Sequence, residues 1–237
     1  TPKPTKLIKY IIKLVPNNED AVILDFFAGS GTTADAVMQL NASDNGKRKF
    51  ILVQFPENLD ESLKNADKDK QMVIKNAINL CDKLDKAHEL SEITMERIRR
   101  AGNKIVSENG NANIDSGFKV FRVDNTNIKW NSLIDIGQID TDQLEYTPDL
   151  VDFKLNFKDA DVVYEVMLRQ RDVALSEKME LLTDIGNRTY LYASSYLVCL
   201  ETEITETMVR SLAAIDPLPI KFIFRDSAFK SDIALKD

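Results

Sequence analysis

The sequence has 237 residues, of which 43% are hydrophobic and 29% are charged, and its formal net charge is −7. That length is enough for one large or two small domains with a buried core. A protein that wraps DNA on its own is usually basic; if this protein acts on DNA, most of the contacts should come from outside this sequence or from a small local patch.

Cysteine and histidine are scarce, with two cysteines and one histidine. Cys81 and Cys199 lie in apolar patterns, which favours buried thiols in a reducing cytosol. The single histidine, His88, argues against His-based triads and zinc sites. No stretch approaches the ~20 apolar residues of a membrane span, and the first residues lack a signal-peptide pattern. We expect a cytoplasmic protein without a metal or a membrane partner.

The first elements form a βαβ pattern. Residues 5–15 carry apolar side chains at helical spacing and predict an amphipathic helix that ends at a Pro-Asn-Asn break. Residues 21–26 predict a buried strand, residues 32–40 a helix and residues 50–55 a second buried strand. For such a unit the expected geometry is a parallel pair with a right-handed crossover.

The middle of the chain is rich in charge and in helix formers. It predicts two helices, over residues 61–88 and 91–107, with Ser91 as the N-cap of the second. Residues 118–123 alternate between apolar and polar and predict a strand, whereas residues 124–158 are acidic and irregular.

The last part of the chain is α+β in character. Residues 160–171 and 205–214 predict helices, and residues 220–224 predict a final strand. Residues 188–193 and 196–200 predict a hairpin, because only two serines separate them.

The segment Asp25-Phe-Phe-Ala-Gly-Ser-Gly-Thr-Thr-Ala carries the clearest chemistry. Its glycines end the first strand and let the backbone approach a ligand closely. The predicted helix begins at Thr32, so its free N–H groups and its positive dipole end point at that ligand. The pattern predicts a site for an anion or a carboxylate, built from main chain.

Two ligands compete for this loop. Gly29, Gly31 and Ala34 also satisfy the loose dinucleotide pattern. Asp25 would repel a pyrophosphate but would attract the ammonium group of a methionine-type cofactor, so it favours S-adenosylmethionine over NAD. A plain turn in which glycine serves only the geometry is the remaining alternative.

A polar residue is expected at the end of the second strand, where it can accept hydrogen bonds from ribose hydroxyls. Gln54 holds that position, and its amide oxygen can accept those bonds. Glu57, three residues further on, is an alternative acceptor, and Gln54 could also be an ordinary strand-end residue.

Several segments closely resemble the modification (methyltransferase) subunits of type III restriction-modification systems, which are beta-group adenine-N6 methyltransferases. The similarity runs nearly end to end. The segments that carry it are Thr1-Pro-Lys-Pro-Thr-Lys-Leu-Ile, Ile23-Leu-Asp-Phe-Phe-Ala-Gly-Ser-Gly-Thr-Thr-Ala, Lys49-Phe-Ile-Leu-Val-Gln, Glu96-Arg-Ile-Arg-Arg-Ala-Gly, Gly117-Phe-Lys-Val-Phe, Leu197-Val-Cys-Leu-Glu and Asp226-Ser-Ala-Phe-Lys-Ser-Asp.

The resemblance implies a set of cofactor-binding residues. Lys3-Pro4 and the helix after them match the family's motif X, Asp25 to Thr33 match motif I, and Gln54 matches the strand-end ribose position. The implied S-adenosylmethionine contacts are Lys3, Pro4, Asp25, Phe26, Ala28, Gly29, Ser30, Gly31, Thr32, Thr33 and Gln54.

One family motif is absent. The catalytic Asp-Pro-Pro-Tyr holds the amino group of the flipped adenine and stacks on its ring. This sequence has seven prolines, and no two are adjacent. The sequence also opens directly at motif X. We therefore expect a C-terminal fragment with no catalytic residue of its own, which is inactive alone.

The predicted fold is α/β, with a partial Rossmann-like methyltransferase sheet followed by a smaller α+β domain. Residues 1–110 would form the cofactor-binding part with a helical extension, and residues 111–237 a domain for assembly or interaction. The resemblance implies three partners: DNA, mainly through the missing N-terminal part, a second copy of the chain, and a restriction helicase-nuclease subunit.

Alternatives of other classes stay open. One is a non-enzymatic module for oligomerisation or subunit docking, and another is a methyltransferase for small molecules or RNA, although no acceptor motif of that kind is found. A basic cluster could contact DNA phosphate, but a solvated helix end that suits the dipole is favoured. The cluster comprises Arg97, Arg99, Arg100 and Lys104.

The missing motif has a consequence for the sheet. In the methyltransferase fold the strand that bears motif I is central, and the strand that bears the catalytic motif lies beside it. We expect residues 21–26 to expose an edge and an apolar face. The outcome would be self-association, coverage by a local segment, or poor order over residues 1–35, with the C-terminal region better packed.

Overall fold

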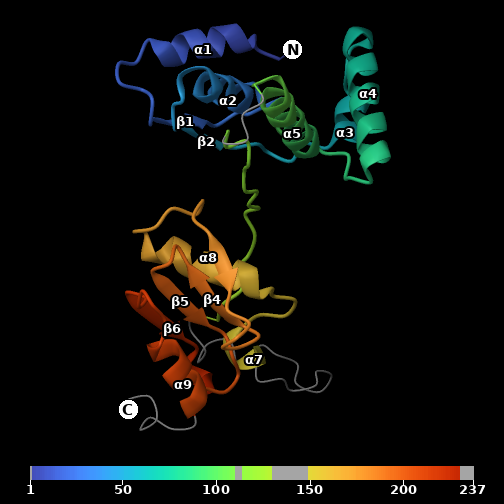
Figure 1. Ribbon diagram of the computed structural model, residues 1–237. Helices are drawn as coiled ribbons and strands as arrows, with labels where there is room; N and C mark the ends of the chain where they lie inside the picture. Colours follow the sequence, from blue (N-terminus) through green and yellow to red (C-terminus); the bar gives the residue numbers. More distant parts are fainter. Residues whose placement is uncertain (1, 110–113, 130–148, 230–237) are drawn as a thin grey trace. The chain divides into compact units, whose positions relative to one another are not determined.

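The computed structural model describes residues 2–109, 114–129 and 149–229 (Figure 1). The chain divides into two compact units, Thr1–Phe118 and Lys119–Asp237. The domain boundary expected after residue 110 and the roles expected for the two parts stay predictions.

Unit 1 contains the predicted βαβ arrangement. Strand β1 (Val22–Asp25) pairs in parallel with β2 (Lys49–Leu52), and Val22 lies opposite Lys49 while Asp25 lies opposite Leu52. Helix α2 (Thr32–Asp44) connects them, and α1 (Thr5–Lys13) precedes β1. The parallel pair is as predicted, but each strand has four residues, because the ladder ends where β1 turns into the loop.

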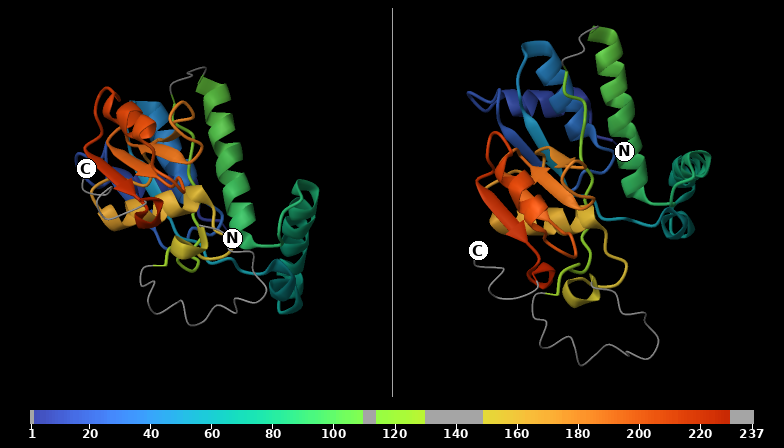
Figure 2. Two further views of the ribbon diagram at one scale, coloured as in Figure 1. Left: turned by 90° about the horizontal axis from the view of Figure 1, so that it is seen from below. Right: turned by 60° about the horizontal axis from the view of Figure 1, so that its bottom comes forward.

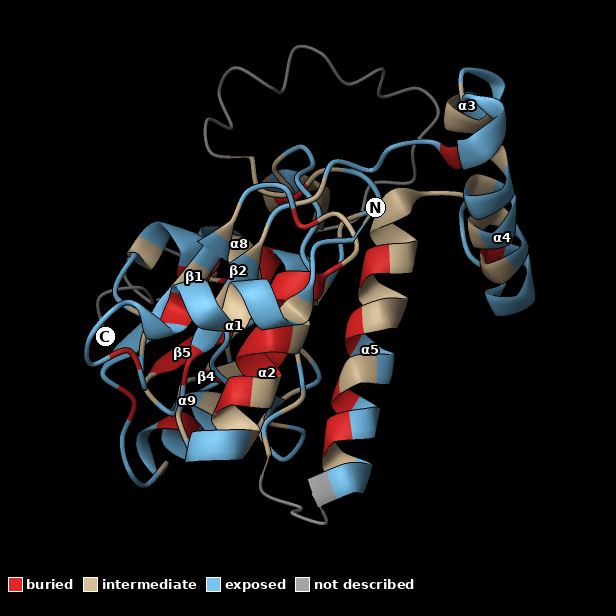
Figure 3. Ribbon diagram, turned by 90° about the horizontal axis from the view of Figure 1, so that it is seen from above, coloured by how far each residue is buried: buried red, intermediate tan, exposed pale blue. Residues whose placement is uncertain are grey.

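Helix α2 is the centre of unit 1, and Figure 3 shows it largely in the colour of buried residues. One side packs against α1, where Ile8 and Ile12 meet Val37 and Leu40. The other side packs against α5 (Leu90–Asn109), where Met38 meets Ile98. Small and apolar residues on both sides explain why this helix is buried all round.

The helix predicted over residues 61–88 is replaced by two helices, which together lie between Leu59 and Leu84. Helix α3 (Leu59–Lys64) is capped by the side chain of Asn58, which accepts from the N–H groups of Asp60 and Glu61. Helix α4 (Lys68–Leu84) follows, and α3 and α4 stand beside the first turns of α5 (Figure 2). The single-helix prediction was wrong because Asn65 ends the first helix.

Two further predictions were wrong. Ser91 is not an N-cap, because α5 already begins at Leu90; its hydroxyl donates instead to Glu89 Oε2 at 3.0 Å. Residues 118–123 form no strand, because no strand in the described ranges lies beside them to complete a ladder. Most of the acidic segment over residues 124–158, namely 130–148, lies outside the described residues.

Unit 2 is built on a four-stranded sheet with the order β3-β4-β5-β6. The predicted hairpin is confirmed as β4 (Thr189–Tyr192) and β5 (Tyr196–Cys199), and the final strand is β6 (Lys221–Phe224), parallel to β5. The edge strand β3 (Met179–Leu181) was not predicted, because three residues carry too little alternation to be recognised.

Two helices cover opposite faces of this sheet (Figure 1). Helix α8 (Asp159–Gln170) packs Val163 and Met167 onto Tyr192 and Val198. Helix α9 (Glu206–Ala213) packs Leu212 onto Leu197 and Cys199. Side chains alternate across a strand, so neighbouring residues of β5 supply both layers of the core.

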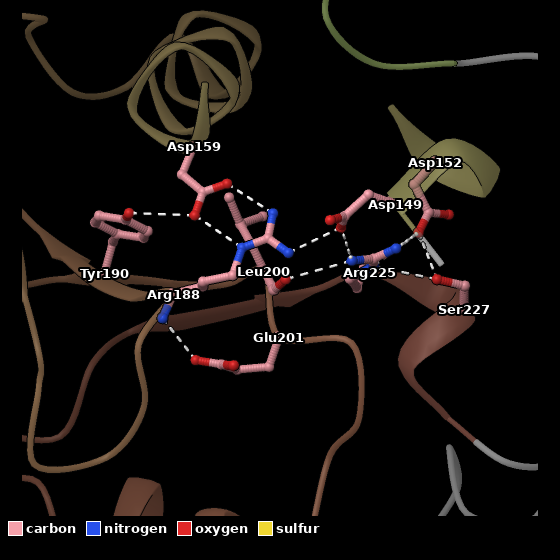
Figure 4. Close-up of polar contacts among 9 residues, drawn as sticks. All are labelled: Asp149, Asp152, Asp159, Arg188, Tyr190, Leu200, Glu201, Arg225 and Ser227. Carbon is pink, nitrogen blue, oxygen red and sulfur yellow. Dashed lines mark hydrogen bonds and ion pairs between the residues drawn. The ribbon is translucent and has the colours of Figure 1, made fainter. Parts of the chain in front are cut away.

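An ion-pair network joins the ends of these elements (Figure 4). Arg225 follows β6 and is only 2% exposed; it pairs with Asp149 at 2.6 Å and with Asp152 at 2.7 Å. Arg188 precedes β4 and pairs with the same Asp149 at 2.8 Å and with Asp159 at 2.6 Å. The network ties the short helix α7 (Asp149–Asp152) and the start of α8 to the sheet.

Candidate functional site

The glycine loop, residues 26–31, connects the end of β1 to the start of α2. Gly29 and Gly31 have φ values of 53° and 73°, in the left-handed region that favours glycine. Val53, directly after β2, makes two main-chain bonds here: it accepts from Ala28 N–H of the loop at 3.1 Å, and its own N–H donates to the carbonyl of Asp25, the last residue of β1, at 2.9 Å. The two strands thus hold the loop at their carboxyl ends.

Asp25 lies at the junction of strand, loop and helix. Its Oδ1 accepts from Phe27 N–H at 3.0 Å, and its Oδ2 accepts from Thr33 Oγ1 at 2.6 Å. The side chain is half-buried, so part of the carboxylate faces solvent. An ionised carboxylate has about four acceptor positions, and these two bonds leave acceptor capacity for a ligand cation.

Gln54 contacts the glycine loop directly. Its Oε1 accepts from Gly29 N–H at 2.7 Å, and its Nε2 donates to the carbonyl of Phe55 at 2.8 Å. Glu57, the alternative ribose acceptor, accepts instead from Ser62 Oγ at 2.6 Å, at the start of α3. Of the two candidates, Gln54 contacts the loop, and the ribose role stays a prediction for both.

The remaining predicted contacts lie around these two residues. Ala28, Gly31, Thr32 and Thr33 are buried, whereas Phe26 is exposed. Ser30 Oγ and Thr32 Oγ1 lie 3.3 Å apart.

Lys3 and Pro4 are exposed and lie before α1, where the Pro4 carbonyl accepts from Leu7 N–H at 3.0 Å. The structure describes no hydrogen bond or ion pair from Lys3 to the loop. The helix they begin contacts α2 instead: Thr5 Oγ1 donates to Asp35 Oδ2 at 3.3 Å.

Helix α5 contributes residues that were not predicted for this site. Thr94 Oγ1 donates to the carbonyl of Gly29, Arg97 Nη1 donates to Ser30 Oγ at 2.5 Å, and Ile98 packs against Gly31. The signal was present in the sequence, because residues 94, 97 and 98 share one helical face with Ala101 and Ile105. The basic residues of the segment favoured its interpretation as a solvated helix end, so this face was not predicted to contact the loop.

The segment that contains this loop also matches known proteins. Residues 1–61 match the family model described as DNA methylase. Over 122 residues, 52% of the chain, it is 45% identical to the type III restriction-modification enzyme StyLTI Mod subunit of Salmonella typhimurium. The chain resembles the Mod subunits of type III restriction-modification systems. Another Mod subunit, EcoPI of Escherichia phage P1, is 38% identical over 119 residues, 50% of the chain.

The match to the Mod subunits covers a small part of them, 16% of the length of each of these two relatives. A shorter match, 54% identical over 54 residues, links 23% of the chain to 13% of the type II methyltransferase M.KpnI of Klebsiella pneumoniae. The chain is therefore similar to proteins named for two types of restriction-modification system.

The basic cluster divides into two kinds of residue. The prediction that it lies at a helix end was wrong, because α5 continues to Asn109. Arg100 and Arg99 pair with Glu96 at 2.7 and 3.3 Å, and the hydrogen bond from Arg100 contributes most to lowering the pKa of Glu96. Lys104 pairs with Glu108 at 3.7 Å on the exposed surface. Arg97 alone of the four contacts the loop in the described part of the chain.

One face of the two-stranded sheet is apolar and open. Val22 and Leu24 of β1, with Ile51 and Val53 at the end of β2, are 48–58% exposed. Leu24 lies opposite Ile51 in the parallel register, so these side chains form one continuous patch. Among the strands that the structure describes, β1 pairs only with β2. The opposite face is covered by α1 and α2.

Other kinds of site are not found in the described ranges. No group of three or more His, Cys, Asp or Glu residues is arranged to hold a metal ion there. None of the helices described has the length and apolar character that a bilayer crossing requires. A cavity of about 500 Å³ lies between the segment after β2 and α4, lined by Phe55, Glu57, Asn58 and Lys70 among others.

Proposed function

We propose that this chain binds S-adenosylmethionine on its glycine loop and forms the cofactor-binding part of a site-specific DNA adenine-N6 methyltransferase of a type III restriction-modification system. The observation that most supports this proposal is the position of Asp25. Its carboxylate lies at the end of β1 and accepts hydrogen bonds from both the loop and the first turn of α2. The similarity to Mod subunits supports the same assignment.

The donor set of the loop fits the amino-acid end of this cofactor. Asp25 offers a carboxylate to the ammonium group, and the first turn of α2 offers its positive dipole end to the carboxylate. A Cβ on Gly29 would meet only the Phe27 carbonyl, at 3.7 Å, so this part of the loop is open to a ligand. The same Asp25 would repel the pyrophosphate of NAD. When bound, S-adenosylmethionine supplies a methyl group activated by its sulfonium sulfur.

The other residues of the proposed site follow from the same arrangement. Gln54 holds the loop through Gly29 and would accept from the ribose with its second lone pair, and Glu57 stays the alternative acceptor. Lys3 and Pro4 would contribute through α1, which is attached to the first turns of α2.

Catalysis would require residues outside these 237, because no two prolines are adjacent and Asp-Pro-Pro-Tyr is therefore absent. The open apolar face of β1 and β2 supports this proposal, since a partial Rossmann-like sheet would need further elements to cover it. In the complete enzyme the adenine would be flipped out, and its amino nitrogen would attack the methyl group directly.

Partners belong to the same proposal. The net charge of −7 supports DNA contacts that lie mainly outside this sequence. We propose that unit 2 serves assembly, either with a second copy of the chain or with a restriction helicase-nuclease subunit, in the cytoplasm. The relatives' designation as Mod subunits supports a subunit role.

Calorimetry with the purified chain tests the cofactor assignment. We expect weak but measurable binding of S-adenosylhomocysteine and no binding of NAD. Asp25→Asn should lower the affinity about tenfold, which corresponds to about 1.4 kcal/mol, because it removes the charge and keeps the shape. The exposed Asp20→Asn is the matched control and should change nothing. Tight NAD binding without binding of the methyl-donor analogue would refute the assignment.

A methyl-transfer assay tests whether the catalytic residues lie outside this chain. Tritiated S-adenosylmethionine and adenine-containing DNA should give no labelled adenine with the chain alone, because no residue of this sequence holds the adenine amino group. Incorporation of label into adenine by the purified chain would show that the acceptor site lies within these residues after all.

A further inference from the structure

Arg97 extends from α5 to the start of α2. Its Nη1 donates to Ser30 Oγ at 2.5 Å, and its Nη2 lies 4.0 Å from Asp35 Oδ2. The side chain is 32% exposed, so the guanidinium closes the edge of the loop and still reaches solvent. A cation therefore stands at the N-terminal turn of a helix.

The neighbours of Arg97 make this position specific. Three residues on one face of α5 each contact a different member of the run Gly29-Ser30-Gly31. Thr94 donates to the carbonyl of Gly29, and Arg97 donates to the hydroxyl of Ser30. Ile98 packs against Gly31. Because α5 is anchored on α2 through Ile98 and Met38, the guanidinium is held in a fixed relation to the loop.

The positive charges at the start of α2 favour the binding of an anion. A positive side chain near a helix N-terminus is unfavourable, because the dipole is already positive there. Asp35 offsets this only in part, since it lies 4.0 Å away and also accepts from Thr5 and Gln39. Ser30 accepts from Arg97, so the hydroxyl proton of Ser30 is left to donate, and Thr32 Oγ1 at 3.3 Å is a weak acceptor. A carboxylate would satisfy both groups.

We infer that Arg97 is a specificity-determining residue of the glycine loop, which selects ligands with a carboxylate on their amino-acid end. It aligns Ser30 toward that carboxylate and balances its charge, whereas Asp25, at the strand end of the loop, receives the ammonium group. This inference rests on the proposed function and deepens it, because it assigns recognition of the methionine moiety to a residue outside the loop itself.

Two probes separate this role from a structural one. S-adenosylhomocysteine carries the amino-acid end, and 5′-methylthioadenosine lacks it. With the full chain, Arg97→Gln should weaken S-adenosylhomocysteine binding about tenfold or more, as expected for a lost charge-assisted hydrogen bond, and should leave methylthioadenosine binding unchanged. Arg97→Lys should lose less. Arg100→Gln, on the same helix but paired with Glu96, is the matched control and should alter neither affinity.

Each other outcome is decisive. Equal losses for both probes would overturn the inference and leave Arg97 a purely structural role, and unchanged binding of S-adenosylhomocysteine would overturn it as well. If Arg97→Gln does not fold, Arg97→Lys carries the test, with a loss confined to S-adenosylhomocysteine. If the unmodified chain binds neither probe, the proposed function itself fails, which is distinguishable from a failure of Arg97 alone.

Discussion

Gly31 and Ile98 approach each other so closely that no side chain fits at the glycine. A Cβ built on Gly31 would lie 2.8 Å from Cγ1 of Ile98 and 3.3 Å from the carbonyl oxygen of Thr94. The contact joins the end of the loop to the middle of α5, and it places the face that carries Arg97 beside the first turn of α2.

Gly31→Ala should therefore destabilise unit 1 in two ways. The left-handed φ of 73° strains any L side chain by roughly 1–2 kcal/mol, and the clash with Ile98 adds about 1–3 kcal/mol of overpacking. Urea unfolding followed by circular dichroism measures the sum.

Gly29→Ala is the matched control for that experiment. It has a similar φ of 53°, but its Cβ would meet only the Phe27 carbonyl, at 3.7 Å. It should show the conformational strain alone, roughly 1–2 kcal/mol. Equal losses for the two variants would show that the Ile98 contact does not constrain the loop.

Asp149→Asn should destabilise unit 2. Oδ1 of Asp149 accepts from both Arg188 and Arg225, and the substitution leaves the buried Arg225 with Asp152 as its remaining carboxylate partner in the described residues. We expect a loss of about 1.5–3 kcal/mol, because the substitution weakens two hydrogen bonds between charged groups while each arginine keeps a second carboxylate partner. Glu206→Gln, which breaks an exposed pair with Arg210, should cost less than about 0.5 kcal/mol. Similar losses for both would contradict a buried network.

The same carboxylate should make unit 2 sensitive to acid. Burial by itself would raise the pKa of Asp149, but hydrogen bonds from Arg188 and Arg225 outweigh it, so the pKa lies below its usual value of 3.8. A lowered folded-state pKa contributes stability that is present above the unfolded value and is lost as pH falls through the folded one. Unfolding free energies between pH 2 and pH 5, about the range of carboxyl titration, should fall less steeply for Asp149→Asn. An unchanged slope would exclude this contribution.

His88 should titrate above its usual pKa of 6.5, because the carboxylates of Asp82 and Asp60 both bond to its ring. The raised pKa contributes stability that is complete below the unfolded value and is lost as pH rises through the folded one. It is the single histidine of the sequence, so one imidazole signal in proton NMR reports its titration directly. Asp82→Asn should lower the midpoint, whereas Asp69→Asn, elsewhere on α4, should not. A midpoint at or below 6.5 would contradict the observed bonds.

The local part of the fold could be predicted from the sequence. Apolar periodicity placed α1, β1, α2 and β2 and the hairpin of unit 2, because each pattern is satisfied by neighbours close in the chain. The break between α3 and α4 and the edge strand β3 escaped prediction, since one depends on a capping asparagine and the other on three residues.

At the glycine loop, too, some features could be predicted from the sequence and others could not. Its residues, its left-handed glycines and the position of Asp25 follow from the sequence, because the strand, the turn and the helix are contiguous. The roles of Thr94, Arg97 and Ile98 were decided only by the tertiary structure, since Gly29 and Thr94 are 65 positions apart in the sequence and carry no local signal of their contact. Helical spacing puts the three on one face, but only the packing of α5 on α2 determines that this face meets the loop.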